Sequence, residues 1–439
     1  MGNTWQQFSP ALLFSCSLIC QSANAELHMQ SHGSLMPVSE VSAPSEASET
    51  DNSELKQHKH DSFATQADIF SHGQEAGNIR TNDNVIEIYG TVFMSVAQTF
   101  DHYTTLTSTG SRLGFRGHKL LRDNLLAFWQ IESIVDLDNL GEAEHGGNRS
   151  RLAGRDSFVG ISNNFGTIVA GKHNLPYKMA VHSWDPFNHL AGDFRTTLGR
   201  LPGFTTDIDH HGNIFHLRAP NALLYYPPVF SGVTTSFALG AIDESINNGA
   251  RHPIISASIH YSYKRLNITY AVESHSKLDI YEHATELDPS LTAPYLIDRS
   301  TAHITGFMAH LGNTMISAIV EGIEIQDPVA PSGLKWSWHI GAIHKLESSY
   351  SMRASLGHSG DFMDHDGGSV IALGLFNSLS EETDMYFSYV QTINNAHGRY
   401  GTFFSDAIED SPESVHNEDN IPLDRFNPYT LSIGLIHQF

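Results

Sequence analysis

The chain has 439 residues, of which 40% are hydrophobic and only 17% are charged, and its formal net charge is -23. No run of eighteen consecutive apolar residues occurs, which excludes a bundle of membrane-spanning helices. The acidic balance argues against nucleic-acid binding, because such a surface needs clustered basic side chains. A chain with this composition can face lipid only as a closed β-barrel, in which every second residue points outward.

Residues 1–25 predict a signal peptide. They are uncharged, and a short apolar run precedes Ala23-Asn24-Ala25, which matches an A-x-A cleavage site. Both cysteines, Cys16 and Cys20, lie here, so cleavage after Ala25 leaves a mature chain without cysteine. That suits an exported protein stabilised by backbone hydrogen bonds. A lipoprotein with Cys16 as the lipidated residue is the alternative, although the apolar stretch before Cys16 is short.

Residues 26–83 form a second region. They carry ten acidic and three basic side chains, are rich in serine, glutamate and histidine, and show no sustained periodicity. This composition predicts a disordered, low-complexity extension in the periplasm.

The pattern changes at Val85. From Ile86 to Val96, apolar residues alternate with polar ones such as Glu87 and Thr91. A two-residue period predicts a β-strand, and its length suits a tilted membrane strand. The barrel domain is therefore expected at 84–439.

Similar segments continue to the end of the chain and predict an all-β, transmembrane barrel of sixteen antiparallel strands. The expected strands are 85–100, 111–118, 124–137, 154–163, 165–173, 213–226, 229–240, 251–263, 266–275, 300–311, 314–325, 334–346, 349–357, 368–378, 384–396 and 427–439.

The expected connections alternate between tight and long ones. Tight turns include Asn163-Asn164, Lys264-Arg265 and Gly312-Asn313, and the long connections are 137–153, 174–212, 276–299 and 397–426. Outer-membrane barrels have short periplasmic turns and long external loops, so this alternation indicates such a barrel with both ends in the periplasm.

Several motifs resemble the general, non-specific trimeric porins of Gram-negative bacteria. Ser111-Arg112-Leu113-Gly114-Phe115-Arg116-Gly117 is similar to the second strand of that family. Arg155-Asp156-Ser157-Phe158-Val159-Gly160-Ile161 and the closing segment from Leu431 to Phe439 also match the family in order. The resemblance extends over 85–439, and the loops are least alike.

This resemblance implies a homotrimer in the outer membrane, each barrel enclosing a water-filled channel for passive diffusion of small hydrophilic solutes and ions. It implies neither a catalytic residue nor a cofactor. The third external loop, here 174–212, would fold inward and narrow the pore. The extension at 26–83 departs from the family pattern, in which the barrel starts almost at the mature N-terminus.

Alternation predicts which charges line the pore, because Arg112 and Arg116 face the lumen when Leu113 and Phe115 face lipid. By the resemblance, acids on the inward loop would face this basic row. Opposed rows of charge create a transverse field that favours polar solutes. The predicted constriction residues are Arg112, Arg116, Arg155, Lys172, Arg218, Asp185, Asp193 and Asp207, with Asp209 as an alternative to Asp207. The ion preference is not readable from the sequence.

The closing strand carries a second prediction. Counting back from Phe439, residues His437, Leu435 and Ile433 should face lipid, and Ile436 is an apolar exception on the inner face. In porins the terminal aromatic strand is read by the barrel-assembly machinery. The resemblance therefore assigns an assembly signal to Phe439, His437, Leu435 and Ile433.

Two other functions stay open. A substrate-specific channel, for a sugar, an amino acid or an anion, would show an aromatic or arginine ladder shaped for its ligand. An enzyme or adhesin on a barrel would need a catalytic constellation at the strand ends, and none stands out.

No metal site is expected. The segment from Asp361 to Gly368 resembles a calcium loop but lacks its bidentate glutamate, and His210-His211 and His58-x-His60 lack further ligands. The acidic external loops instead predict divalent cations that bridge to lipopolysaccharide.

Overall fold

The computed structural model describes residues 85–99, 104–108, 110–122, 124–135, 137, 152–200, 204–206, 215–241, 253–282, 295–326, 333–346, 349–362, 365–396, 398, 400–403 and 427–439. The predicted signal peptide at 1–25 and the predicted extension at 26–83 lie outside these residues. Within them, no helix is both long enough and apolar enough to cross a membrane.

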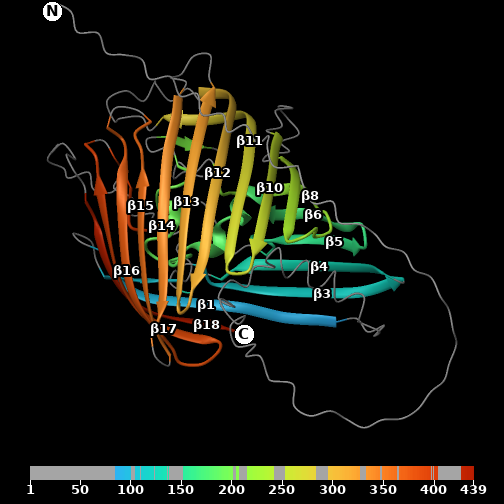
Figure 1. Cartoon of the computed structure of the whole chain (residues 1–439), viewed down its shortest axis with the longest axis horizontal. Coiled ribbons are helices and arrows are strands. Elements are labelled where there is room, and N and C mark those ends of the chain that lie inside the picture. The colour runs from blue at the N-terminus through green and yellow to red at the C-terminus, as the bar shows by residue number, and fades with distance from the viewer. Residues whose placement is uncertain are drawn as a thin grey trace, which may run out of the picture. The chain divides into compact units, whose positions relative to one another are not determined.

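Sixteen antiparallel strands form a closed barrel in the described part of the chain (Figure 1). They are β1 (Val85–Thr99), β3 (Arg112–Arg122), β4 (Leu125–Ile134), β5 (Ser157–Asn163), β6 (Gly166–Asn174), β8 (Arg218–Tyr226), β9 (Val233–Ala241), β10 (Pro253–Tyr263), β11 (Leu266–Glu282), β12 (Tyr295–Leu311), β13 (Thr314–Gln326), β14 (Gly333–Lys345), β15 (Tyr350–Ser359), β16 (Gly368–Ser378), β17 (Thr383–Asn394) and β18 (Tyr429–Gln438). Two short strands, β2 (Thr104–Thr107) and β7 (Phe204–Thr206), join the same sheet.

Barrel closure occurs between the first and last strands. β1 pairs with β18 in a register that runs from Thr91 opposite Gln438 to Thr99 opposite Thr430. Beyond it, Gly90 and Phe439 exchange main-chain hydrogen bonds, with N···O distances of 2.9 and 3.1 Å. The predicted sixteen-stranded antiparallel barrel is confirmed.

The tight turns agree with the sequence prediction. Tyr263 pairs with Leu266 across Lys264, which has a φ of 53°, and Leu311 pairs with Thr314 across Gly312, which has a φ of 59°. A positive φ at the first turn residue is typical of the primed turns that match the twist of a hairpin.

The strands have one apolar and exposed face. On the outer face of β1, Ile86 and Ile88 are 68% and 61% exposed. Tyr89 lies on the opposite face, as Glu87 does, and is buried. Exposed aromatic side chains gather at the tight-turn end of the barrel and at the chain end: Phe165, Phe230, Tyr263, Tyr350 and Phe439. Such a girdle marks the periplasmic interface of an outer-membrane barrel.

The closing strand alternates as predicted. Ile433, Leu435 and His437 are exposed on the outward face, and Phe439 is 54% exposed. Ile436 lies on the inner face and is 4% exposed. The lipid-facing assignment of these residues is confirmed, and their role as an assembly signal stays a prediction.

A bulge lies between β2 and β3, which both pair with β1. Thr107 of β2 lies opposite Ser95 and Arg112 of β3 lies opposite Thr91, so residues 108–111 stand against one residue fewer on β1. The Ser111 hydroxyl closes the gap, because its Oγ lies 2.9 Å from both the nitrogen and the oxygen of Phe93. Bulges bend a strand locally, and this one forms a seat for the segment described next.

Candidate functional site

Residues 175–200, hereafter the inner segment, follow β6 and form the first part of the connection to β8. They are almost entirely buried. They include α2 (Pro176–Met179) and the 3-10 turns η2 (His182–Trp184) and η3 (Phe194–Thr196). The Tyr177 N–H donates to Ser256 on β10 (3.0 Å), the Ser317 hydroxyl on β13 donates to the Trp184 carbonyl (2.8 Å), and Arg353 on β15 donates to the Pro186 carbonyl (3.0 Å).

These three wall residues identify the face on which the inner segment lies. Ser256, Ser317 and Arg353 alternate with the outward, exposed Ile255, Ile316 and Met352. The inner segment therefore contacts the face of β10, β13 and β15 that points away from the lipid side, as expected of an inward-folded third loop.

Apolar packing fixes the inner segment from two directions. Tyr177, Trp184 and Phe194 pack against β11, β12 and β13 through residues such as Ile304 and Ile319. Phe187, Leu190 and Ala191 pack against β16, β17 and β18, and Ile436 belongs to this second cluster. The apolar exception on the inner face of the closing strand is thus explained, because it contacts protein rather than water.

Glycines on the wall allow this close approach. A Cβ placed on Gly306 would lie 2.5 Å from the Trp184 ring, and one on Gly341 would lie 2.6 Å from Pro186. On the opposite side, a Cβ on Gly110 in the bulge would lie 3.1 Å from His189. The inner segment therefore spans from β12 and β14 to the bulge between β2 and β3.

Glu321 on β13 holds both ends of the inner segment. Its side chain is fully buried, and Oε1 accepts a hydrogen bond from the Tyr177 hydroxyl (2.8 Å) and lies 2.8 Å from His216 Nε2. Its Oε2 accepts from the Gly199 N–H at 2.6 Å. One carboxylate thus joins α2, the end of the inner segment and the residue two positions before β8.

Two of the predicted wall arginines meet at a glutamate. Arg155 Nε lies 2.5 Å from Glu132 Oε1, and Arg112 Nε lies 4.0 Å from Glu132 Oε2. The Tyr89 hydroxyl also donates to Glu132, at 3.0 Å. All three charged side chains are buried, so Glu132 partly neutralises the arginine pair.

A second ion pair continues this wall. Arg218 Nε on β8 lies 2.5 Å from Asp156 Oδ1, and Asp156 also accepts hydrogen bonds from the backbone and side chain of Asn174. Burial alone would raise the pKa of Asp156, but Arg218 and other nearby cations lower it to about 2. Asp156 is therefore ionised, and Arg218 is the more exposed partner.

Two other predicted wall residues lie apart from this group. Arg116 forms a bidentate pair with Glu87 of β1, at 2.8 and 2.6 Å, and both side chains are partly exposed. Lys172 is in register with Ser157, which lies on the same, outward face of β5 as Val159 and Ile161. The register therefore does not bring Lys172 into the inner group.

The predicted loop acids lie inside the inner segment rather than on its surface. Asp185 accepts from the backbone N–H groups of Phe187 and Phe194, at 3.1 and 2.9 Å. Asp193 holds the Arg195 guanidinium at 2.8 and 2.6 Å and accepts from the His189 N–H. A row of solvent-facing acids opposite the wall arginines is therefore not formed by these two residues, and Asp207 and Asp209 lie outside the described residues.

The two buried acids differ in how favourably they carry a negative charge. Burial and the neighbouring Asp193 carboxylate raise the pKa of Asp185 well above its usual value. Burial opposes ionisation of Asp193 as well, but the adjacent Arg195 guanidinium lowers its pKa below the usual value. The negative charge is therefore more favourable on Asp193, beside Arg195, than on Asp185.

In the segment that resembles a calcium loop, the two described acids accept hydrogen bonds from the protein itself. Asp361 accepts from the Gly367 N–H (2.6 Å) and from the Asn395 amide (2.8 Å), and Asp366 accepts from the Phe362 N–H at 2.7 Å. Across the described ranges, no three His, Cys, Asp or Glu side chains gather in a way that could hold a metal ion.

Sequence reasoning missed several site residues: Glu132, Lys178, Arg195 and Glu321. Two of them carried a signal, since Glu132 is the only acid at an inward position of β4 and Glu321 the only one at an inward position of β13. Lys178 and Arg195 lie in irregular loop structure, where alternation gives no information on orientation.

Comparison with known proteins identifies the family. The family model described as Gram-negative porin matches residues 71–397. The chain belongs to this family. Its members are channel proteins of the outer membrane, and the prediction of a non-enzymatic porin in that membrane is confirmed.

Among curated relatives, chitoporin of Vibrio furnissii is 26% identical over 303 residues, which is 62% of this chain and 78% of the relative. The major outer membrane protein P.IB of Neisseria sicca is 32% identical over 114 residues, 23% of this chain and 30% of the relative.

Among solved structures, the anion-selective porin from Comamonas acidovorans aligns with a TM-score of 0.64 at 18% identity, covering 81% of this chain and all of that one. A loop-deletion form of OmpT from Vibrio cholerae aligns with a TM-score of 0.59 at 13% identity, covering 81% and 99%. These likenesses confirm the fold of the porin.

Proposed function

We propose that this porin passes small hydrophilic solutes and ions by passive diffusion through a water-filled lumen narrowed by the inner segment. A sixteen-stranded barrel is wider than its own side chains can fill, so an aqueous passage is its expected content. The supporting observation is the docking of residues 175–200 onto the inner wall. A loop held in this way sets the pore width by contacts within the protein, without any bound cofactor.

Reconstitution into a planar bilayer tests this proposal. The expected result is a stable, ohmic conductance, together with liposome swelling rates that fall steadily as uncharged sugars become larger. Absence of conductance in a correctly folded preparation would refute the proposal.

A substrate-specific channel is the second candidate, favoured by the similarity to chitoporin over 78% of that relative's length. Titration of chitooligosaccharides into the same bilayer chamber separates the two candidates. Block of the current at micromolar sugar would favour the specific channel, whereas unchanged current at millimolar sugar would favour general diffusion.

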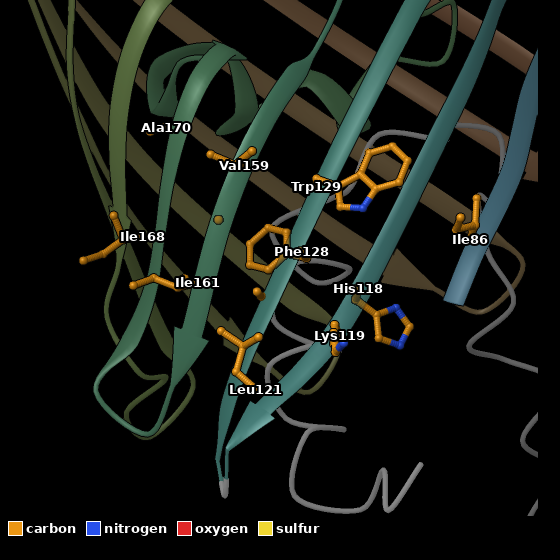
Figure 2. Close-up of a pocket in the computed structure, with 12 residues that line it drawn as sticks. Ile86, His118, Lys119, Leu121, Phe128, Trp129, Val159, Ile161, Ile168 and Ala170 are labelled. Carbon is orange, nitrogen blue, oxygen red and sulfur yellow. The ribbon is translucent and has the colours of Figure 1, made fainter. Parts of the chain in front are cut away.

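We propose further that the protein is a homotrimer that associates through the outer face of β1 and β3–β6. A hollow of about 650 Å³ lies on this face, and Figure 2 shows Trp129, Val159, Ile161 and Ile168 around it. Ala170 contributes a small side chain to the same lining. A hollow apolar surface accommodates protruding side chains of another chain, and the solved OmpT of Vibrio cholerae includes a trimer form.

An alanine-to-tryptophan substitution tests this interface. Ala170→Trp would fill part of the hollow, so we expect loss of the threefold mass in native mass spectrometry. Ala354→Trp is the matched control, because Ala354 has outward parity on β15, away from the hollow. Trimers that persist in Ala170→Trp would place the interface elsewhere.

The remaining partners follow from the membrane location. We propose that acidic external loops bind divalent cations that bridge to lipopolysaccharide, and that the barrel-assembly machinery reads the closing strand. Chelation that leaves oligomer stability in outer-membrane extracts unchanged would contradict the cation bridge.

A further inference from the structure

The connection from β17 to β18 contributes a second buried piece of chain. Its residues 400–403, hereafter the outer strap, follow a turn that begins where β17 ends. The Asn394 side-chain amide pairs with both backbone groups of Tyr400, with N···O distances of 3.0 Å. Tyr400 is fully buried, and Thr402 is 2% exposed. Part of a long connection is thus enclosed by other parts of the protein.

The outer strap contacts the tip of the inner segment directly. The Gly192 N–H donates a hydrogen bond to the Thr402 carbonyl at 2.8 Å. Phe403 packs against the apolar cluster that contains Phe187 of the inner segment. The Thr402 hydroxyl also lies 2.6 Å from the hydroxyl of Thr430 on β18. The outer strap therefore joins the inner segment to the closing strand.

A buried lysine of the wall joins the outer strap to the other end of the inner segment. Lys335 lies on the inner face of β14, between the outward Leu334 and Trp336, and is 1% exposed. Its ammonium group donates a hydrogen bond to the Tyr400 hydroxyl at 3.1 Å and another to the Arg200 carbonyl. The last residue of the inner segment and the first residue of the outer strap thus share one cation.

The wall around Tyr400 is shaped for its ring. The Tyr400 hydroxyl, which accepts from Lys335, donates to Ser359 on β15 at 2.8 Å. A Cβ placed on Gly368 of β16 would lie 2.7 Å from the ring, and the Arg200 guanidinium lies 5.8 Å from the ring centre. Because β14, β15 and β16 are neighbours in the sheet (Figure 1), three adjacent strands and the inner segment hold this one side chain.

Burial of the ammonium group couples the two pieces of chain. A charge removed from water depends on hydrogen-bond partners within the protein. Departure of the outer strap would take the Tyr400 hydroxyl away from Lys335 and would uncover the contact with Arg200 at the same time. Glu321 accepts from the neighbouring Gly199 N–H, so the end of the inner segment is fixed by a base on β14 and an acid on β13.

We propose that the outer strap is a latch for the inner segment. While Tyr400 is docked on Lys335, the inner segment stays against the wall. When the outer strap leaves, the inner segment gains freedom to move and the passage widens. This inference rests on the proposed diffusion function and adds a conformational control, in which a connection between two strands shifts the population of pore states.

Single-channel recording of Tyr400→Phe tests the latch. Phenylalanine keeps the ring but removes the hydroxyl that lies between Lys335 and Ser359. Loss of a hydrogen bond to a charged group corresponds to about a tenfold change in an equilibrium constant, so brief steps to a higher conductance should become about tenfold more frequent. Tyr389→Phe is the matched control, because the Tyr389 hydroxyl donates to Gln391 on the outer face of β17.

A double-mutant cycle separates a latch from general damage. Lys335→Met removes the cation and retains an unbranched side chain, so it should raise the step frequency as Tyr400→Phe does. Since both changes break the same hydrogen bond, the double variant should raise the frequency by less than the product of the two single effects. A full product would overturn the shared latch. The heat-dependent change in electrophoretic mobility confirms that each variant is folded.

Two further outcomes would overturn the inference in different ways. Step frequencies in Tyr400→Phe equal to those of the native protein, even with a lower thermal midpoint, would show that the outer strap only stabilises the barrel, and the diffusion function would stand. A native protein that folds but conducts no current would overturn the diffusion function, and the role of the latch in pore width with it.

Discussion

Replacing Glu321 with glutamine should loosen the inner segment without altering the shape of the wall. Glutamine retains an oxygen for Tyr177 and His216, but it places an amide nitrogen where Oε2 accepts from the Gly199 N–H at 2.6 Å. Disrupting a buried, hydrogen-bonded charge costs about 3 kcal/mol. About 1.4 kcal/mol corresponds to a factor of ten in an equilibrium constant. The fraction of molecules whose inner segment is detached from the wall should therefore rise about a hundredfold.

Single-channel recording measures this change directly. Brief steps to a higher conductance should become about a hundredfold more frequent in Glu321→Gln and about fivefold more frequent in Tyr177→Phe, which removes one hydrogen bond worth about 1 kcal/mol. Glu273→Gln is the matched control, because Glu273 is also a buried inner acid but its hydrogen-bonded partner is His275 on the same strand. Identical recordings from Glu321→Gln and the native protein would refute the tethering role of Glu321.

Three further predictions concern assembly and stability. Deletion of Phe439 should reduce trimer yield in outer-membrane fractions while export remains intact, and a normal yield would exclude an assembly role. Ser111→Ala removes two hydrogen bonds to the Phe93 backbone and should cost about 1–3 kcal/mol, seen as a lower thermal midpoint in detergent. Burial and then Arg195 lower the pKa of Lys178, which means that the unfolded chain binds a proton that the folded protein releases, so stability should rise with pH up to about 10.4. Lys178→Met should flatten this dependence of stability on pH. An unchanged dependence in that variant would contradict the role assigned to Lys178.

The barrel was predictable because its alternation has a single cause. One face of every strand meets lipid, so apolar residues recur at every second position, and sixteen segments followed from this rule. Strand ends differ from the prediction by up to seven residues, as at the end of β11, where Glu282 rather than 275 is the last residue. The two extra strands, β2 and β7, are short and lie outside the regular pattern.

The constriction was less predictable. Alternation placed Arg112 on the inner face, but it could not show that Glu132 joins it to Arg155, because that contact crosses between strands. The loop acids were assigned by resemblance, yet Asp185 bonds to the segment's own backbone and Asp193 to that backbone and to Arg195. A loop side chain can point to water or to its own backbone, and no periodicity distinguishes these two outcomes.

The register of the barrel seam has a consequence for any residues added to the chain. Because Phe439 ends opposite Gly90, the first five residues of β1, Val85 to Tyr89, pair with β3 but extend beyond the last residue of β18. A peptide fused after Phe439 would meet this open edge and could continue β18 by up to five residues. The fusion would complete the seam, yet it would move the terminal aromatic residue away from the end of the chain. Under the assembly role proposed for the closing strand, a tag at this position would be tolerated by the folded barrel but would impair its assembly.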